Sequence, residues 1–338
     1  MADGVKLAIV GATGAVGQEM LKVLEERNFN IKEILLLADP REAGTKIKFK
    51  GETITVRSVS PEAFKQSDLA LFAVGTDISQ LLAPMAVDNN CLVIDNSYAF
   101  RMEAGVPLVV PEVNPEDIAS HRGIIANPNC STIIMVVAIN PIHKAAGLKR
   151  VIVSTYQAVS GAGKAGIDEL ERNTRDYLEN KEAKSEVFQH QIAFNLIPHI
   201  DVFGEDNYTR EEMKMVFETR KIMHVPDLRI APTAVRVPVF RSHSESINLE
   251  TEKHLSVAEA RKILSSAPGV IVQDDPANNI YPMPLYASNT DEVYVGRIRR
   301  DISLDNGLAF WVSADQIRKG AATNAIQIAE IVVDKNLF

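Results

Sequence analysis

Residues 5–17 read VKLAIVGATGAVG, and this stretch decides the fold. The apolar run at 5–10 is typical of a buried strand, and a helical pattern follows at 14–26. Between them lie Gly11, Gly14 and Gly17. Glycines at this spacing permit a tight turn, a close approach of the backbone to a pyrophosphate, and close packing of helix on strand. A helix N-terminus also favours anions. The stretch therefore predicts a dinucleotide-binding loop, in preference to an ordinary structural turn.

Short apolar runs alternate with helical stretches up to about residue 94. We expect further strands at 31–38, 69–74 and 91–94, with a helix at 77–89. Strands that alternate with helices indicate a parallel, doubly wound sheet of Rossmann-like type. Cys91 falls within the last of these strands, so we expect it to be structural.

The pattern changes after residue 129. Strands are expected at 150–159, 229–249 and 292–302, with helices at 164–184 and 209–223. This order of elements predicts an α+β domain with a mixed or antiparallel sheet.

These patterns predict two domains. The expected division is a dinucleotide-binding domain at 1–129 and a catalytic domain at 130–316. A last helix, expected at 319–333, lies in the segment 317–338, which is expected to pack back on the first domain.

Composition excludes several classes of function. The 338 residues carry a net charge of −8, and 46% are hydrophobic, as in ordinary globular proteins. Acids and bases are interspersed without a basic block, which argues against nucleic acid and membrane surfaces. No apolar stretch is long enough to span a bilayer, and Met1 to Lys6 lack a signal-peptide pattern. Two cysteines form no disulfide framework and no metal-ligand cluster, so we expect a cytoplasmic protein without a bound metal.

Cys130 is the candidate nucleophile. It lies in NPNCST at 127–132, directly before the apolar run at 133–139. Asn129 is a favoured residue for capping a helix, so the thiol is expected in the first helical turn. The helix dipole and unpaired N–H groups there favour the reactive thiolate. A buried cysteine that only fills the core is an equal alternative from these six residues alone.

The end of the second strand bears on cofactor choice. An acid at this place accepts hydrogen bonds from a free ribose 2′-OH of NAD, whereas an arginine pairs with the 2′-phosphate of NADP. This chain offers Asp39, Arg41 and Glu42. Charges solvated in a loop are the alternative for each.

Taken together, these motifs closely resemble the aspartate-semialdehyde dehydrogenases of bacterial type, over essentially the full length. Besides the glycine loop and Asn129-Cys130-Ser131-Thr132, the resemblance rests on four segments: TYQAVSGAG at 155–163, EEMK at 211–214, VRVPVFRSH at 235–243 and KGAATNA at 319–325.

The resemblance implies a set of roles. Cys130 would form a thioester, His243 would act as the acid/base near its ordinary pKa, and Gln157 would orient the substrate. Arg236 would bind the substrate carboxylate and Glu211 its amino group, while Arg101, Asn129 and Lys214 would bind phosphate. The residues expected at the cofactor are Gly11, Thr13, Gly14, Ala15, Val16, Arg41, Glu42, Ser160, Gly161 and Gln316.

The resemblance also implies the ligands and the assembly. The expected substrates are aspartyl phosphate, aspartate semialdehyde and phosphate, and a homodimer is expected through the second domain. NADP is the expected cofactor because Arg41 is kept. Asp39 and Glu42 occupy places where the family has small hydroxyl residues, and their charge opposes a 2′-phosphate, so use of NAD stays open.

Two geometric expectations follow from spacing. Arg236 and His243 are seven residues apart, which on an uninterrupted strand would place them on opposite faces, so we predict a bulge or turn near Arg241 and Ser242. Glu211 and Lys214 are three apart and should share one face of a helix. For Glu211 and Lys214, the alternative is an ordinary surface ion pair. For Arg101 it is a solvated position in a loop, and for His243 it is a structural role.

Three other functions remain possible from the sequence. An N-acetyl-glutamyl-phosphate reductase would share the thioester chemistry, but PNCST at 128–132 fits the aspartate enzymes better. A glyceraldehyde-3-phosphate dehydrogenase would leave Arg236 and Glu211 without an amino-acid head group to bind. A non-catalytic dinucleotide-binding relative would not need Cys130 and His243 together.

Overall fold

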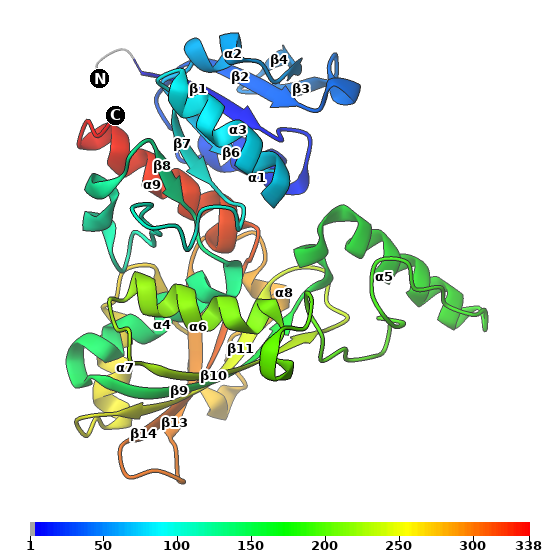
Figure 1. Ribbon diagram of the computed structural model, residues 1–338. Helices are drawn as coiled ribbons and strands as arrows, with labels where there is room; N and C mark the ends of the chain where they lie inside the picture. Colours follow the sequence, from blue (N-terminus) through cyan, green and yellow to red (C-terminus); the bar gives the residue numbers. More distant parts are fainter. Residues whose placement is uncertain (1–3) are drawn as a thin grey trace. The chain divides into compact units, whose positions relative to one another are not determined.

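The computed structural model describes residues 4–338 and divides them into two compact units (Figure 1). The first unit contains residues 4–129 together with 321–338, and the second contains residues 130–320. Each unit is built on a six-stranded sheet. The part of the signal-peptide expectation that concerns Met1 to Asp3 lies outside the described residues.

The sheet of the first unit is entirely parallel, in the order β5-β2-β1-β6-β7-β8. β1 (Val5–Val10) lies between β2 (Ile31–Ala38) and β6 (Leu69–Phe72). The loop after β1 therefore opens where the strand order reverses, which is where open parallel sheets bind ligands. The other strands are β5 (Arg57–Ser58), β7 (Leu92–Asp95) and β8 (Ile124–Ala126), and a separate hairpin pairs β3 (Lys46–Phe49) with β4 (Glu52–Thr55).

Helices cover both faces of this sheet (Figure 1). α1 (Ala15–Glu26) and α9 (Thr323–Asp334) pack on one face, in a core that includes Leu7 and Ile9. α2 (Pro61–Lys65) and α3 (Thr76–Asp88) pack on the other, with Ala8 and Val10. Successive strand residues point to opposite faces, so the apolar run of β1 serves both layers. The doubly wound parallel sheet predicted from the sequence is confirmed.

The sheet of the second unit is mixed, in the order β10-β9-β11-β14-β13-β12. β11 (His243–Thr251) and β14 (Gly307–Ala314) form its antiparallel centre. β9 (Leu148–Gln157) pairs antiparallel with β11 and parallel with β10 (Arg229–Arg236). On the far side β13 (Val293–Arg300) pairs with β14 and with the short β12 (Val270–Val272). The predicted mixed sheet is therefore confirmed.

One face of this second sheet carries helices. α4 (Cys130–Ala146), α6 (Arg210–Ile222) and α7 (Val257–Ser265) pack there, and the long α5 (Gly163–Leu178) extends away from the sheet (Figure 1). The opposite face, which we call the outer face, presents Ile152, Tyr156 and Trp311, all of which are partly exposed. Their strand neighbours Val151, Val153 and Val312 are buried on the helix side.

Several element boundaries differ from those expected. β14 was missed because its residues, GLAFWVSA, form a nearly continuous apolar run instead of an alternating one, as happens in strands buried at a sheet centre. α5 ends at Leu178 and not at 184, because Asn180 takes a left-handed conformation with φ of 56°. The helix expected from 319 begins with a π-helical turn, Arg318–Ala322, before α9. Cys91 lies just before β7 and is buried.

Among residues 4–338, no helix combines the length and apolarity that a membrane span requires.

Candidate active site

The glycine loop follows β1 in the first unit and is shaped by close backbone contacts. Gly11 has φ of 87°, and a Cβ there would lie 2.4 Å from the carbonyl oxygen of Ala73. A Cβ on Gly17 would lie 2.3 Å from the carbonyl oxygen of Gly11, so α1 can approach the loop only with glycine at that position. Gly14 precedes α1 without a side-chain cap, and the first turn holds no acid. These features fit a pyrophosphate at the helix N-terminus.

Three charged residues just after β2 form side-chain hydrogen bonds with other residues of the first unit. Asp39 accepts bonds from Arg41 at 2.8 Å (Nε to Oδ1) and 3.1 Å (Nη2 to Oδ2). Glu42 accepts a bond of 3.0 Å from the hydroxyl of Thr13 in the glycine loop. The side-chain bond from Arg41 is the main reason that the pKa of Asp39 is lowered to about 2. Arg41 is thus paired with a carboxylate, although its side chain is largely exposed.

Arg101 and Asn129 are both buried in the first unit. The guanidinium of Arg101 donates a bond of 2.8 Å to the carbonyl oxygen of Asn96, which ties the arginine to the end of β7. Arg101 is therefore not the solvated loop arginine that was the alternative.

Cys130 is the first residue of α4, so the thiol lies in the first helical turn as predicted. It is partly exposed, whereas Cys91 is buried. Gly320 lies against it, since a Cβ on Gly320 would approach the Cβ of Cys130 to 2.8 Å. For Cys91, burial raises the pKa of the thiol to about 12. Only Cys130 therefore combines exposure with a helix start, the conditions that favour a reactive thiolate.

Arg236 and His243 both lie against Gly161. β10 ends at Arg236, β11 begins at His243, and Ser242 between them has φ of 72°, so the predicted interruption of the strand is confirmed. A Cβ on Gly161 would lie 2.8 Å from Nη1 of Arg236 and 3.6 Å from Nε2 of His243. Both side chains therefore pack against Gly161, where any side chain would collide with the guanidinium.

His243 is completely buried and is held by backbone. Its Nδ1 accepts a bond of 3.0 Å from the backbone N–H of Ala158. Burial lowers the pKa of His243 to about 3, and the charge of Arg236 lowers it further against an opposing effect of Glu211. The ring is therefore neutral in the resting protein, a consequence of burial that the sequence does not show.

Gln157 lies at the end of β9 in a chain of buried hydrogen bonds. The hydroxyl of Thr155 donates to its Oε1 at 3.0 Å, and its Nε2 donates to Glu211 at 3.1 Å. The same Nε2 lies 3.4 Å from Nε2 of His243. Thr155 thus orients the amide so that its N–H₂ group faces Glu211 and His243.

Glu211 and Lys214 form a buried ion pair on one face of α6, as their spacing predicts, with Nζ to Oε2 at 3.0 Å. Both side chains are at most 13% exposed, so this is not the surface ion pair that was the alternative. Asp201 completes the group, because it accepts a bond of 2.9 Å from Nζ of Lys214 and two bonds from Arg210. Burial alone would lower the pKa of Lys214, but Glu211 and Asp201 outweigh it and raise the pKa.

Ser160 and Gln316, expected at the cofactor, are bonded to each other in the second unit. The side-chain oxygen of Gln316 also accepts a bond of 2.8 Å from the backbone N–H of Ser242. Gln316 thereby fixes the residue next to His243.

Sequence reasoning missed three residues of this group: Ala158, Thr155 and Asp201. Ala158 acts through its backbone, which leaves no compositional signal. Thr155 lies two residues before Gln157 on the same face of β9, a spacing that would have identified it. Asp201 lies in an irregular segment and has a positive φ of 70°, so no periodic pattern indicates it.

Within residues 4–338, no group of three or more His, Cys, Asp or Glu side chains is placed to hold a metal ion.

One unit carries a dinucleotide loop. The other carries a cysteine at a helix start together with a buried His, Arg and Glu. This combination is typical of the class of semialdehyde dehydrogenases. Two family models match: the NAD binding domain of semialdehyde dehydrogenases over residues 6–121 and their dimerisation domain over residues 139–319.

Comparisons with individual proteins give the same family. An aspartate-semialdehyde dehydrogenase of Aquifex aeolicus is 57% identical over 99% of this chain and 100% of its own length. The crystal structure of aspartate semialdehyde dehydrogenase II complexed with ASA from Vibrio cholerae is 47% identical, with a TM-score of 0.96 over 98% of both chains. The Candida albicans enzyme, solved with NADP, is 26% identical, with a TM-score of 0.77 over 99% of this chain and 100% of its own. The chain belongs to the aspartate-semialdehyde dehydrogenase family and is an oxidoreductase that binds a nicotinamide dinucleotide.

Proposed function

We propose that the chain catalyses the NADPH-dependent reductive dephosphorylation of L-aspartyl 4-phosphate to L-aspartate 4-semialdehyde through a thioester on Cys130. The observation that carries the proposal is the arrangement in the second unit, where Arg236 and His243 lie side by side against Gly161, and Gln157 bonds Glu211 and approaches His243. Family membership supports the same reaction. The product would serve biosynthesis of lysine through diaminopimelate, and of threonine, methionine and isoleucine.

Each residue has a role that its surroundings support. Cys130 attacks the acyl carbonyl, and its position at the start of α4 favours the thiolate. Arg236 is buried and has a planar guanidinium, which suits a bidentate bond to the substrate carboxylate. Glu211 binds the amino group, and Gln157 orients the acyl group.

His243 acts as the acid/base that moves the proton. Lys214, Arg101 and Asn129 bind the phosphate group of the substrate. The positive charge on Lys214 is maintained by the two carboxylates beside it.

The dinucleotide is held by the loop after β1. Gly11, Thr13, Gly14, Ala15 and Val16 would hold its pyrophosphate, and Arg41 and Glu42 its ribose. From the second unit, Ser160, Gly161 and Gln316 would also contact the cofactor. When bound, the nicotinamide supplies hydride. We propose NADP as the preferred form because Arg41 is present, with NAD as an alternative substrate because Asp39 already holds that guanidinium.

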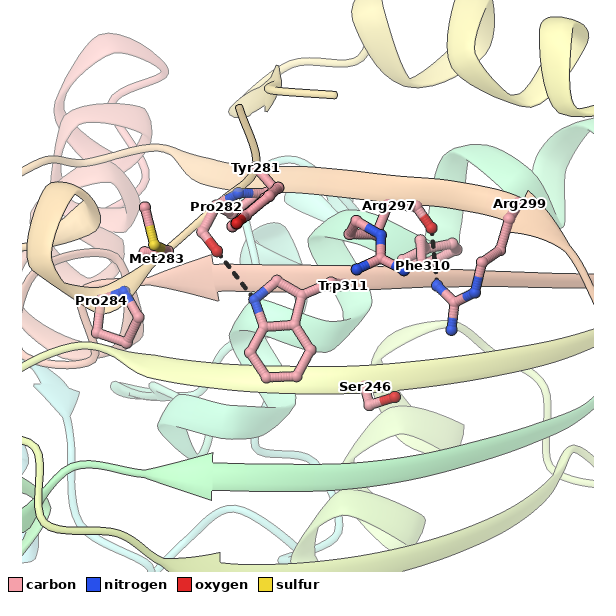
Figure 2. Close-up of a pocket in the computed structure, with 9 residues that line it drawn as sticks. All are labelled: Ser246, Tyr281, Pro282, Met283, Pro284, Arg297, Arg299, Phe310 and Trp311. Atoms are coloured by element: carbon pink, nitrogen blue, oxygen red, sulfur yellow. Dashed lines mark hydrogen bonds between the residues drawn. The ribbon is translucent and has the colours of Figure 1, made fainter. Parts of the chain in front are cut away.

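We propose a homodimer whose contact includes the outer face of the second sheet. This face carries a hollow of about 320 Å³ lined by Trp311, Tyr281, Phe310 and the two arginines Arg297 and Arg299, among others (Figure 2). The indole N–H of Trp311 donates a bond of 3.0 Å to the carbonyl oxygen of Pro282, and Tyr156 packs on the indole at 5.2 Å between ring centroids. Aromatic residues and arginine are enriched in protein interfaces, and the family model that covers this region is named for dimerisation.

The reaction is tested with purified protein, L-aspartate 4-semialdehyde, phosphate and NADP⁺, followed at the absorbance of the reduced nicotinamide. We expect turnover that Cys130→Ala reduces by at least about 10³-fold, since no other group can carry the thioester. Cys91→Ala is the matched control and should keep most of the activity. N-acetyl-glutamate semialdehyde should be a poor substrate. No turnover of aspartate semialdehyde, or full activity of Cys130→Ala, would contradict the proposal.

The compartment is tested separately. We propose that the protein works in the cytoplasm, where a thiol such as Cys130 stays reduced. Fractionation of cells that express the full chain should place it with cytoplasmic markers.

A further inference from the structure

Phe188 is a buried aromatic residue whose ring lies against Arg236. It belongs to the irregular segment 184–197 that follows α5, and it is only 8% exposed. The carbon Cζ of Arg236 lies over the ring, 5.7 Å from its centroid. At this distance the positive guanidinium is attracted to the negative face of the ring in a cation–π interaction. Phe188 is therefore a direct neighbour of the side chain to which we assign the substrate carboxylate.

Arg236 makes few hydrogen bonds for a buried arginine. The residue is 7% exposed, and within residues 4–338 its guanidinium donates one hydrogen bond, from Nη1 to the carbonyl oxygen of Ala158 at 2.8 Å. A guanidinium carries five N–H donors, so most of them remain for a ligand. Burial lowers the pKa of Arg236, and the charges of Glu211 and Cys130 act in the opposite direction. The side chain thus needs a neighbour that stabilises its charge and fixes its position.

An aromatic ring can do both without occupying the donors. The ring of Phe188 attracts the cation but has no lone pair, so the N–H groups stay available to a carboxylate. An acid in the same place would neutralise the guanidinium and occupy the donors. The ring also excludes water from its side of the guanidinium, and an ion pair with a ligand is stronger where less water surrounds it.

The backbone of Phe188 is held by a buried carboxylate on α5. Glu169 is 1% exposed and accepts three bonds from consecutive backbone N–H groups. These come from Glu186 at 2.9 Å, Val187 at 2.6 Å and Phe188 at 3.3 Å. Hydrogen bonds to an ionised acceptor are stronger than those between neutral groups. Glu169 therefore fixes the stretch of chain from which the ring projects.

Other residues of α5 hold the rest of the segment. Asn173, one turn after Glu169, donates a bond of 2.9 Å to the carbonyl oxygen of Lys184 and accepts one of 3.3 Å from the backbone N–H of Ile192. On the same helix, a Cβ added at Gly166 would lie 3.1 Å from Cζ of Phe188, so the tip of the ring packs against α5. The ring is thus confined between this helix and Arg236.

We propose that Phe188 is a positioning residue that holds the guanidinium of Arg236 for the substrate carboxylate, and that Glu169 acts through the backbone of residues 186–188 to place the ring. The inference rests on the proposed function, which assigns the carboxylate to Arg236. Because the carboxylate does not react, loss of the ring weakens binding of the substrate and of the transition state alike. The expected signature is a raised KM with kcat nearly unchanged.

The first test alters the ring while its shape is nearly kept. Replacing Phe188 with 3,5-difluorophenylalanine withdraws electrons from the ring face and leaves the tip beside Gly166 unchanged. KM for aspartate semialdehyde should rise about two- to threefold, and about five- to tenfold in Phe188→Leu, with kcat within about twofold in both. An unchanged KM in both variants would overturn the inference.

Ile192→Val is the matched control for stability. Ile192 belongs to the same buried cluster as Phe188, so loss of a methyl group there should lower Tm by about 2 °C and leave KM unchanged. A rise in KM equal to that of Phe188→Leu would show that any loosening of the cluster has this effect, and would overturn the specific role of the ring.

The second test measures binding without turnover. L-2-aminobutyrate has the carbon skeleton and head group of aspartate semialdehyde, with a methyl group in place of the aldehyde. Its Kd, measured by titration calorimetry, should rise about five- to tenfold in Phe188→Leu. L-2-aminobutyramide, which lacks the carboxylate, should bind weakly and equally to both proteins.

The outcomes of this binding test separate the inference from the proposed function. No binding of L-2-aminobutyrate to the native chain, or the same Kd in Phe188→Leu, would overturn the role of Phe188. If Kd changes as expected but the protein does not turn over aspartate semialdehyde, the proposed function fails and the role of Phe188 at a carboxylate site stands.

The third test concerns Glu169. Glu169→Gln keeps the shape of the side chain but replaces a charged acceptor with a neutral one, so KM should rise about two- to threefold. Combined with Phe188→Leu it should add little, because the ring that it places is already gone. Fully additive effects, or no effect of Glu169→Gln alone, would overturn the link from Glu169 to Arg236.

Discussion

Asp39 holds the guanidinium of Arg41 in a two-point ion pair, with Nε to Oδ1 at 2.8 Å and Nη2 to Oδ2 at 3.1 Å. The acid that would bind a free ribose hydroxyl is thus bonded to the base that would bind a 2′-phosphate. We therefore expect the choice between NAD and NADP to depend on both side chains.

Removing the charge of Asp39 should shift the preference toward NADP. In Asp39→Asn, Arg41 is released and no carboxylate at that position repels the 2′-phosphate, so the ratio of kcat/KM for NADP to that for NAD should rise about three- to tenfold. Glu42→Gln is the comparison: it also removes a charge that opposes a 2′-phosphate, but it leaves the Asp39–Arg41 pair intact, so its ratio should rise less. A fall in the ratio for Asp39→Asn would contradict this account.

The two cysteines should differ sharply in reactivity. Iodoacetamide at pH 7.5 should alkylate Cys130 stoichiometrically, because it is partly exposed at a helix start. Cys91 should remain unmodified in the folded protein, because it is buried and its pKa is raised to about 12. Peptide mass spectrometry measures both sites. Phosphate or a substrate analogue should slow the modification of Cys130, and equal labelling of both cysteines would contradict the assignment.

Replacing Asp201 should raise KM for phosphate more than it lowers kcat. In Asp201→Asn, Lys214 loses the bond to one carboxylate that fixes its position, so KM for phosphate should rise about tenfold with a smaller change in kcat. Arg210→Gln is the control, because Arg210 is about half exposed and its bond to Asp201 is worth little. Equal effects of the two substitutions on KM would show that Asp201 acts only through the fold.

Glu245 should make stability fall as pH rises. It is completely buried in β11, and among residues 4–338 neither of its carboxylate oxygens has a hydrogen-bond partner. Burial raises its pKa well above the ordinary value, so the folded state holds a proton that the unfolded state releases. The stability this proton provides is complete below the unfolded pKa and is lost as pH rises toward the folded pKa.

Glu245→Gln imitates the protonated acid and removes that dependence. At pH 8 its Tm should exceed that of the native chain by roughly 2–4 °C, equivalent to about 1 kcal/mol, and the difference should shrink toward pH 4. Glu250→Gln on the same strand should show no such trend. Thermal unfolding followed by circular dichroism measures both, and a pH-independent difference would contradict the interpretation.

A charge on the outer face should weaken the proposed dimer. Ile152 is 38% exposed on this face of β9, and Ile152→Glu would place a carboxylate within an apolar contact. Sedimentation velocity should show a shift from dimer to monomer. Ile78→Glu, at a half-exposed position on α3 in the other unit, is the control and should leave the dimer intact. An unchanged dimer in Ile152→Glu would place the contact elsewhere.

Local patterns in the sequence determined much of this protein. VKLAIVGATGAVG sets a strand, a glycine turn and a helix in order, because each depends on side-chain size and apolar spacing within a few residues. The start of α4 at Cys130 and the shared helix face of Glu211 and Lys214 follow from the same short-range rules. The short strands β3, β4, β5, β8 and β12, the helices α2 and α7, and the apolar strand β14 were not predicted.

Only the tertiary structure decided the electrostatic state of the site. The neutral ring of His243, the pairing of Lys214 with Asp201 and the unpartnered acid of Glu245 depend on burial and on residues distant in the chain, up to 85 positions for Ala158 and His243. Such contacts leave no local signal, because a backbone N–H is common to every residue except proline. The sequence by itself identified the residues for the chemistry, and the fold determined which protons and charges they hold, since burial and long-range hydrogen bonds set a pKa.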